Sequence, residues 1–254
     1  MLKDKLSAGS WPDDRREAVV DNDLIIERFF QMLISGDREA SRDLITETLQ
    51  MGMTPEEMAA QIIWPSYDLV DRLHRADQIT RLAHRLATRL LRSLVDQLAL
   101  QYQQKPKRNL SVFALSGPTE ADELASQMAV DLLEADGYTV VFAGGGIAND
   151  EIIAQLGEMQ PDTLLLFASA PCDLPEIRQL IDTIREIGTC GDVQIVVGGG
   201  VFNRADGLAE EIGADLWANT PDQIVKRLAE EPGRRATSEQ RTVGLRRKKR
   251  AEAA

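Results

Sequence analysis

Residues 110–125 read LSVFALSGPTEADELA, and this stretch decides how the chain folds. Leu110–Leu115 is a short and almost continuously apolar run, which is typical of a strand buried on both faces. After a turn at Gly117 and Pro118, the pattern predicts a helix over Glu120–Asp136 that ends at Gly137. A buried strand that passes directly into a helix is the repeating unit of parallel α/β sheets.

The same alternation continues to about residue 230. It predicts strands at Thr139–Ala143, Thr163–Ala168, Gln194–Val197 and Leu216–Ala218, and helices at Asn149–Met159, Pro175–Ile187, Arg204–Ile212 and Pro221–Ala229. We therefore expect an α/β domain over residues 110–230, with a five-stranded parallel sheet of the flavodoxin or Rossmann-like type and helices on both of its faces. Ligands of such sheets bind beyond the carboxyl ends of the strands.

Residues 21–104 have a helical pattern instead. Apolar side chains recur at steps of three and four residues, first at Leu24, Ile25, Phe29, Met32 and Leu33, and in a last helix over Gln78–Gln104 at Ile79, Leu82, Leu86, Leu90, Leu94 and Leu98. Thr54, Pro55 and Glu57 have the spacing of a capped helix start. We expect a bundle of four helices, joined to the sheet by a linker at residues 105–109. Leu86 and Leu165 are expected to be core residues.

Composition and net charge exclude several classes of protein. The 254 residues carry a net charge of −12, which disfavours binding to nucleic-acid backbones, except through the basic run Arg246–Arg250. No apolar run is long enough to span a membrane, and the start of the chain lacks the apolar core of a secretory signal. Two cysteines, Cys172 and Cys190, form no disulfide framework. We expect a cytoplasmic protein with a flexible start at residues 1–20 and a disordered basic tail at residues 231–254.

The turn before the first helix of the sheet domain lies where α/β proteins bind cofactors, yet it offers only carboxylates. Glu120, Asp122 and Glu123 stand there without a histidine, a lysine or a nucleophile, so no catalytic centre is predicted. Thr119 and Asp122 can form a capping box instead, and the negative charges would repel a dinucleotide phosphate. Two glycine triplets, Gly144–Gly146 and Gly198–Gly200, could let a flat ligand approach the backbone at the same edge.

A helical bundle followed by such a sheet resembles the cobalamin-binding module of corrinoid proteins and of cobalamin-dependent regulators and antirepressors, over about residues 21–229. The first loop of that family is Asp-x-His-x-x-Gly, with a second Gly twelve residues on, and Ala125 and Gly137 have that separation. Its third strand ends in Ser-x-Leu, matched by Ser169-Ala170-Pro171, and its fourth in Gly-Gly, matched by Gly198-Gly199. A closing Gly-Ala-Asp stands at residues 213–215.

The chain departs from that pattern at the metal ligand. Aligned through Ala125, the Asp of the motif falls on Glu120 and its cobalt-binding His on Asp122. Light-sensing regulators of this superfamily cover the upper face of the cofactor with Trp-x9-Glu-His, which falls on Leu73, Ala83 and His84, and a histidine after the Trp falls on His74. The resemblance implies cofactor-binding positions at Glu120, Asp122, Ala125, Gly144, Ser169, Gly198, Gly199, His74 and His84, with His84 or His74 as the metal ligand.

The resemblance implies a non-enzymatic sensory or regulatory protein that binds cobalamin with its own base on cobalt and signals to a regulatory protein partner. Three alternatives stay open: a haem-binding variant with His84, His74 or Cys172 as axial ligand, a corrinoid methyl carrier of a methyltransferase system, and a ligand-free interaction scaffold. His74 and His84 stand among arginines, so both also fit a solvated surface. The sequence leaves a homo-oligomer open as well.

Overall fold

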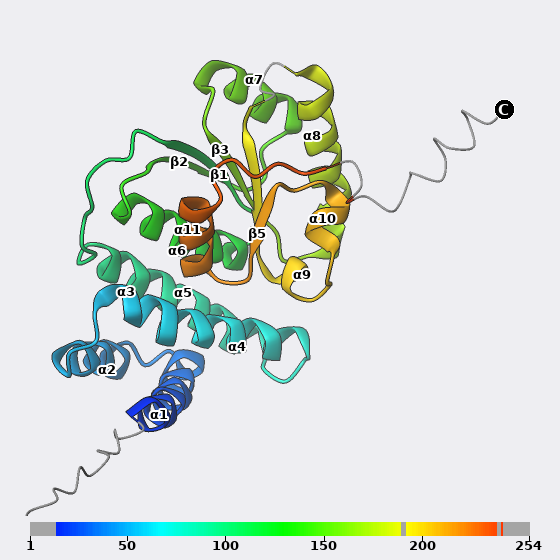
Figure 1. Cartoon of the computed structure of the whole chain (residues 1–254). Coiled ribbons are helices and arrows are strands. Elements are labelled where there is room, and N and C mark those ends of the chain that lie inside the picture. The colour runs from blue at the N-terminus through cyan, green and yellow to red at the C-terminus, as the bar shows by residue number, and fades with distance from the viewer. Residues whose placement is uncertain (1–13, 189–191, 238–239, 241–254) are drawn as a thin grey trace, which may run out of the picture.

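A computed structural model describes residues 14–188, 192–237 and 240 (Figure 1). Its first part is helical and contains α1 (Asp14–Ser35), α2 (Arg38–Gln50), α3 (Pro55–Met58), α4 (Trp64–Arg75) and α5 (Arg81–Ala99). A π-helical turn at Ala59–Ile63 joins α3 to α4, so these two helices form one continuous rod. The described residues of this part therefore form four rods, as predicted.

Local capping residues set where these helices begin. The Thr54 side chain accepts from the Glu57 backbone, Glu57 bonds back to the backbone of Thr54, and Pro55 occupies the first turn, which confirms the predicted helix start. The last helix begins at Arg81 rather than Gln78, because Asp77 adopts a left-handed backbone with φ +55°. Thr80 then caps the helix by accepting a hydrogen bond from the backbone of Ala83.

The apolar stripe of the bundle is buried in its middle but not at one end. Phe29, Leu33 and Leu98 are buried. The prediction that Leu86 belongs to the core is wrong, since it is 38% exposed, and Leu24 and Leu82 of the apolar pattern are exposed by 55% and 69%. Leu86 contacts the turn after α1 at Gly36, and Leu82 lies one helical turn further out, beyond the end of α1.

The second part confirms the predicted α/β fold. Strands β1 (Ser111–Leu115), β2 (Thr139–Gly144), β3 (Thr163–Phe167), β4 (Gln194–Gly198) and β5 (Leu216–Ala218) form one parallel sheet in the order β2-β1-β3-β4-β5. Each strand agrees with its prediction to within one residue at either end. The strand order reverses between β1 and β3, which is where doubly wound sheets open a crevice for ligands.

Helices cover both faces of the sheet. One face packs against α6 (Glu120–Ala135) and α11 (Pro221–Glu230), and the other against α7 (Asn149–Met159), α8 (Leu174–Ile187) and α10 (Leu208–Ile212). The prediction of a single helix over Arg204–Ile212 is wrong. A short α9 (Gly200–Asn203) precedes that range, and within it only α10 is helical, after a turn in which Gly207 has φ +77°.

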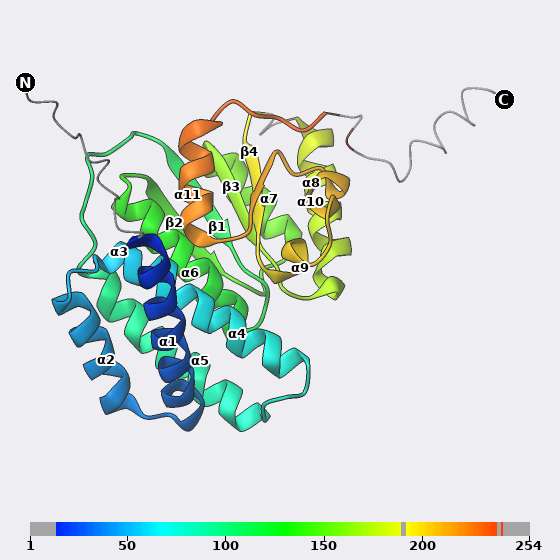
Figure 2. The same ribbon diagram turned by 60° about the horizontal axis from the view of Figure 1, so that its bottom comes forward.

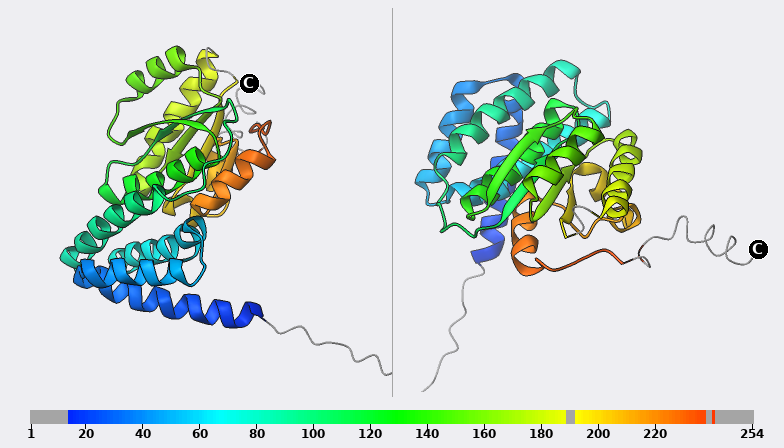
Figure 3. Two further views of the ribbon diagram at one scale, coloured as in Figure 1. Left: turned by 90° about the vertical axis from the view of Figure 1, so that its left-hand side faces the viewer. Right: turned by 90° about the horizontal axis from the view of Figure 1, so that it is seen from above.

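The bundle lies across the edge at which the strands end. α5 contacts α6, α4 lies beside the loops that follow the strands, and α1 and α2 form the outer layer (Figures 2 and 3). The core on the α6 face is continuous with that of the bundle. The helical part is therefore positioned to close over the carboxyl ends of β1, β3 and β4.

Two end segments differ from expectation. Residues 14–20, expected to be loose, form the start of α1. Residues 231–237, expected to be disordered, follow the sheet because its polar groups bind them: the side chain of Gln194 donates to the carbonyls of Glu231 and Arg234, and the backbone of Ala236 donates to the buried Asp215. The basic run at residues 246–250 and residues 1–13 lie outside the described residues.

No helix in the described ranges is both long enough and apolar enough to cross a lipid bilayer.

Candidate functional site

The bundle and the sheet enclose a narrow space, here named the rim cleft. One wall is α4, with Trp64, Tyr67, Asp68 and Asp71, and the other consists of Asp122, Ala125, Phe167, Ala168, Ser169, Gly199, Gly200 and Asn203. Its volume is about 10 Å³, which is far below that of a cofactor pocket. The rim cleft is therefore closed, and a large ligand can enter only if the two walls separate.

Tyr67 holds the two walls together. Its ring is buried, and its hydroxyl donates a hydrogen bond of 2.9 Å to the carbonyl oxygen of Ala121 in the first turn of α6. Trp64 lies beside it, with the two ring centroids 5.3 Å apart. Burial raises the pKa of Tyr67 above its usual range, and the nearby Asp122 carboxylate raises it further. The phenol therefore stays protonated and remains a hydrogen-bond donor.

Asp122, which aligns with the cobalt-binding histidine of the corrinoid-protein motif, serves as part of a capping box. Its Oδ2 accepts a hydrogen bond of 2.5 Å from the hydroxyl of Thr119, and that hydroxyl oxygen in turn accepts from the Asp122 backbone. Its other oxygen, Oδ1, is buried and makes no hydrogen bond within the described residues. Burial raises the pKa of Asp122, against the effect of the Thr119 bonds. The sequence-based reading of Thr119 and Asp122 as a capping box is confirmed.

The glycines of the fourth strand have two different roles. Gly199 has φ +104°, and a Cβ atom there would lie 2.4 Å from the carbonyl oxygen of Ala168, so only glycine fits. Gly198 does not open a crevice, because a Cβ atom there would meet the Phe167 ring at 3.1 Å and Ile224 at 3.0 Å. The space beside Gly198, expected to receive part of a ligand, is filled by these two side chains.

Other expected site residues are divided among three places. Ser169 and Ala125 line the rim cleft, and the Ser169 carbonyl accepts a hydrogen bond from Arg204. Gly144 lies outside it, at a separate pocket between α7 and α8. Glu120 faces α5 instead, where its carboxylate lies 3.7 Å from Arg89. The neighbouring Glu123 pairs with Arg92 at 3.1 Å, so these two acids dock α6 onto the bundle.

His74 and His84 contact each other rather than the rim cleft. Their rings stack at 4.0 Å between centroids where α4 ends and α5 begins. Burial lowers the pKa of His84 to about 4, with further lowering from His74 and Arg85. The described residues contain no group of three or more His, Cys, Asp or Glu side chains that could hold a metal ion. Cys172 is exposed, and Cys190 lies outside the described residues.

Sequence reasoning missed a charged group at the end of the rim cleft. Arg75 forms an ion pair with Asp71 one turn earlier in α4, and a Cβ atom on Gly200 would lie 3.7 Å from the Arg75 guanidinium. Burial lowers the pKa of Arg75, as does the nearby guanidinium of Arg204. The spacing of Tyr67, Asp71 and Arg75 at four-residue steps was the available signal, since it places them on one face of a helix.

Comparisons with known proteins agree with the architecture. Residues 25–99 match a family model described as a B12 binding domain. The chain is 22% identical over 209 residues to trimethylamine corrinoid protein 2 of Methanosarcina acetivorans, covering 80% of this chain and 94% of that protein. It is 28% identical over 112 residues to a corrinoid protein of Desulfitobacterium hafniense, covering 43% of this chain and only 51% of that protein.

A solved structure gives the same picture at the level of the fold. The monomethylamine corrinoid protein of Methanosarcina barkeri superposes with a TM-score of 0.72 at 17% identity, over 82% of this chain and 99% of that one. The resemblance to corrinoid proteins that was inferred from the bundle, the sheet and its loops is confirmed, and these comparisons support a corrinoid as the ligand class.

The residues of the rim cleft lie where a parallel sheet binds its ligand, but the metal-binding group that they offer is a carboxylate. The walls meet at the carboxyl ends of β3 and β4, the edge at which parallel sheets bind ligands. Asp122 supplies one buried oxygen without a partner in the described residues. Carboxylates suit hard ions, whereas cobalt in a corrinoid favours nitrogen donors. Among the described residues, this wall therefore offers a corrinoid a carboxylate and no imidazole.

Proposed function

We propose that this chain, whose helical part matches a B12 binding domain, is the corrinoid-binding subunit of a methyl-transfer system. The relatives found are named as corrinoid proteins of trimethylamine and dimethylamine, compounds that carry methyl groups on nitrogen. They support the methyl-carrier alternative better than the sensory role expected first. Bound corrinoid would supply a cobalt centre able to carry a methyl group. Partner methyltransferases would supply the catalytic residues.

The observation that carries this proposal is the layer of α4 over the strand ends. Tyr67 and Asp122 face each other across the rim cleft, from two parts of the chain that are far apart in sequence. Parallel sheets bind ligands at this edge. A helical layer placed over it forms an upper wall for a flat ligand, and the aromatic rings of Trp64 and Tyr67 give that wall an apolar surface.

The residues of the rim cleft would do two things. Tyr67, through its bond to Ala121, keeps the walls together in the absence of ligand, so that the apolar surface is protected from water. Gly199 lets the loop after β4 pack directly against the Ala168 backbone, which fixes the lower wall of the cleft. The rim cleft has to open before a corrinoid can bind, and opening costs free energy. The apparent affinity for a corrinoid should therefore be lower than that of the open form, by the ratio of closed to open molecules.

Binding is tested by mixing the purified protein with hydroxocobalamin or cobinamide and separating bound from free ligand by gel filtration. We expect coloured protein with one corrinoid per chain. A Gly199→Val variant, whose side chain would strike the Ala168 carbonyl, should bind much less, whereas the exposed control Gly157→Ala should bind normally. Colourless wild-type protein with both ligands would contradict the proposal.

The carrier role needs a separate measurement. Protein loaded with isotope-labelled methylcobalamin is given to a methylcobalamin-dependent methyltransferase with homocysteine, beside free methylcobalamin at the same concentration. We expect faster transfer of the label from the loaded protein. Equal or slower transfer would reject the carrier role while leaving corrinoid binding intact.

A second candidate is the ligand-free interaction scaffold. It is favoured by the closed rim cleft and by the use of Asp122 as a helix cap. The two candidates differ in the gel-filtration experiment, because a scaffold stays colourless.

A further inference from the structure

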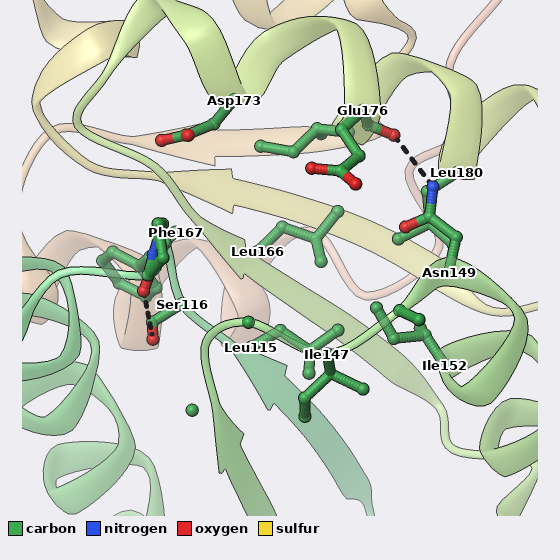
Figure 4. A pocket seen from close by; sticks show the side chains of 16 residues that line it. Leu115, Ser116, Ile147, Asn149, Ile152, Leu166, Phe167, Asp173, Glu176 and Leu180 are labelled. Carbon is green, nitrogen blue, oxygen red and sulfur yellow. Dashed lines mark hydrogen bonds between the residues drawn. The ribbon is translucent and has the colours of Figure 1, made fainter.

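A second pocket opens at the same end of the sheet, on the side covered by α7 and α8 (Figure 4). Its volume is about 290 Å³, close to the lower limit of small-molecule sites. Its apolar lining comes from Leu115 and Leu166 of the sheet, Ile147 and Ile152 beside α7, and Ile177 and Leu180 of α8. We name it the α7–α8 pocket. It lies at the reversal of strand order between β1 and β3.

The polar groups of the α7–α8 pocket are acceptors. Asp173 and Glu176 line the pocket at the start of α8, and Figure 4 shows the Glu176 carboxylate turned into the hollow, with the Asp173 carboxylate at its edge pointing away from Glu176. The amide nitrogen of Asn149 donates to the Glu176 carbonyl at 3.4 Å, which leaves the amide oxygen as an acceptor. The hydroxyl of Ser116 already donates to the carbonyl of Gly117. No lysine or arginine lines the pocket.

Helix capping does not account for this arrangement. Acidic residues at the start of a helix interact favourably with the helix dipole, which explains why the charges here are negative. However, the Asp173 side chain makes no capping hydrogen bond to α8. Its Oδ2 atom is buried without a hydrogen-bond partner among the described residues, and its Oδ1 has only the thiol of Cys172, at 3.6 Å. A buried carboxylate oxygen without a donor is unfavourable, and a ligand with N–H groups would satisfy it.

The charge of the ligand follows from the lining. Asp150 and Glu151 add negative charge to the first turn of α7, and beyond the effect of burial Asp173 lies close enough to Asp122 to raise the pKa of that carboxyl further. Phosphates and carboxylates are therefore repelled, although two helix starts face the pocket. An ammonium group, in contrast, can donate three hydrogen bonds to the acceptors around it. An apolar body attached to that ammonium would rest on the side chains of Leu115, Leu166 and Ile152.

We propose that the α7–α8 pocket binds a small primary ammonium compound with an apolar body, whose ammonium group lies between Asp173 and Glu176. The site is adjacent to the rim cleft: Phe167 lines both, and Asp122 of the rim cleft lies against Gly117 of the pocket, but the two sites have otherwise different linings. The proposal does not depend on corrinoid binding.

Three ligands of the same size test the proposal by NMR titration of the full chain: 2-phenylethylamine, the neutral 2-phenylethanol and the anionic phenylacetate. We expect saturable binding of the amine that shifts the signals of Ser116, Asn149 and Glu176. The alcohol should bind at least ten times more weakly, and phenylacetate should not bind. Equal binding of amine and alcohol would overturn the proposal, and so would the absence of saturable binding by the amine.

Matched variants separate the pocket from general charge effects. Glu176→Gln keeps the size of the side chain and removes its charge, and we expect the amine to bind at least ten times more weakly. Glu186→Gln removes the same charge from an exposed position further along α8 and should leave binding unchanged. Asp173→Asn should weaken binding as Glu176→Gln does. Equal affinities for the Glu176 and Glu186 variants, with normal melting of both, would overturn the proposal.

Discussion

The hydroxyl group of Tyr67 in α4 donates a hydrogen bond of 2.9 Å to the main-chain carbonyl of Ala121 at the start of α6, across a sequence separation of 54 residues. This bond joins the helical layer to the helix that follows β1, directly beside the carboxylate of Asp122. It closes the rim cleft at the position where a corrinoid would have to enter. The strength of this contact therefore affects both stability and ligand entry.

Replacing Tyr67 with Phe should lower the free energy of unfolding by about 1 kcal/mol, because a buried hydrogen bond is lost while the ring remains. Tyr138→Phe is the matched control, since the Tyr138 hydroxyl is buried without a hydrogen bond in the described residues. Urea unfolding of both variants measures the difference. The same unfolding midpoint for both would show that the bond between Tyr67 and Ala121 does not stabilise the fold.

Asp131 on α6 should make the protein less stable as pH rises from about 4 to about 7. Burial raises its pKa to about 7, and one of its oxygens is buried without a hydrogen bond in the described part of the chain. In this window the unfolded state has lost the proton and the folded state has kept it, so unfolding becomes easier as pH rises. Asp131→Asn should remove this dependence, worth on the order of 2 kcal/mol.

Chemical denaturation at several pH values measures the effect of Asp131→Asn. The exposed Asp150→Asn serves as the control and should keep the slope of the wild-type protein. A wild-type slope for Asp131→Asn would mean that this carboxyl titrates alike in the folded and unfolded states.

Leu165 and Leu86 should respond differently to truncation. Leu165 in β3 is fully buried, so Leu165→Ala should lower the free energy of unfolding by about 2–5 kcal/mol. Leu86 is 38% exposed at the end of the bundle, and Leu86→Ala should lower it by less than about 1 kcal/mol. Thermal melting distinguishes them, and a comparable loss in both would place Leu86 in the core after all.

Asp122→His should change how a corrinoid is held, if the rim cleft binds one. The new imidazole would offer the nitrogen donor that a carboxylate does not provide. We expect the reduced cobalamin-loaded variant, labelled with ¹⁵N-histidine, to show hyperfine coupling to a protein nitrogen in its EPR spectrum, whereas the wild-type protein shows none. Asp122→Asn, which also removes the charge, is the control. Protein-nitrogen coupling in the wild type would contradict the assignment of Asp122.

Local sequence was sufficient to predict most of the secondary structure. The strands could be predicted because their apolar runs are continuous. The capping box of Thr119 and Asp122 could be predicted because it depends only on two residues that are three apart in sequence. The break at Gly207 was missed because glycine within a helical pattern is often tolerated. Leu86 was wrongly assigned to the core, since periodicity identifies a helix face but does not show where the neighbouring helix ends.

The candidate site could be predicted only in outline. The topology of a parallel sheet places the loops after the strands at one edge, which located Ser169 and Gly199. The contact of Tyr67 with Ala121 depends on how the bundle is placed, and nothing in the local sequence specifies that. The α7–α8 pocket was missed for a related reason, because Leu115 and Leu166 have the same sequence signature whether they line a hollow or fill a core.

The fully buried Asp215 ties a segment beyond α11 to the folded sheet. Its carboxylate accepts hydrogen bonds from Arg185, from the backbone of Ile195 and from the backbone of Ala236, which lies beyond the last helix. Through this shared carboxylate, the segment around Ala236 is held against β4 and the start of β5. A shortened protein that stops at Glu230 would leave this buried anion with one donor fewer, so a truncation that preserves stability has to keep Ala236.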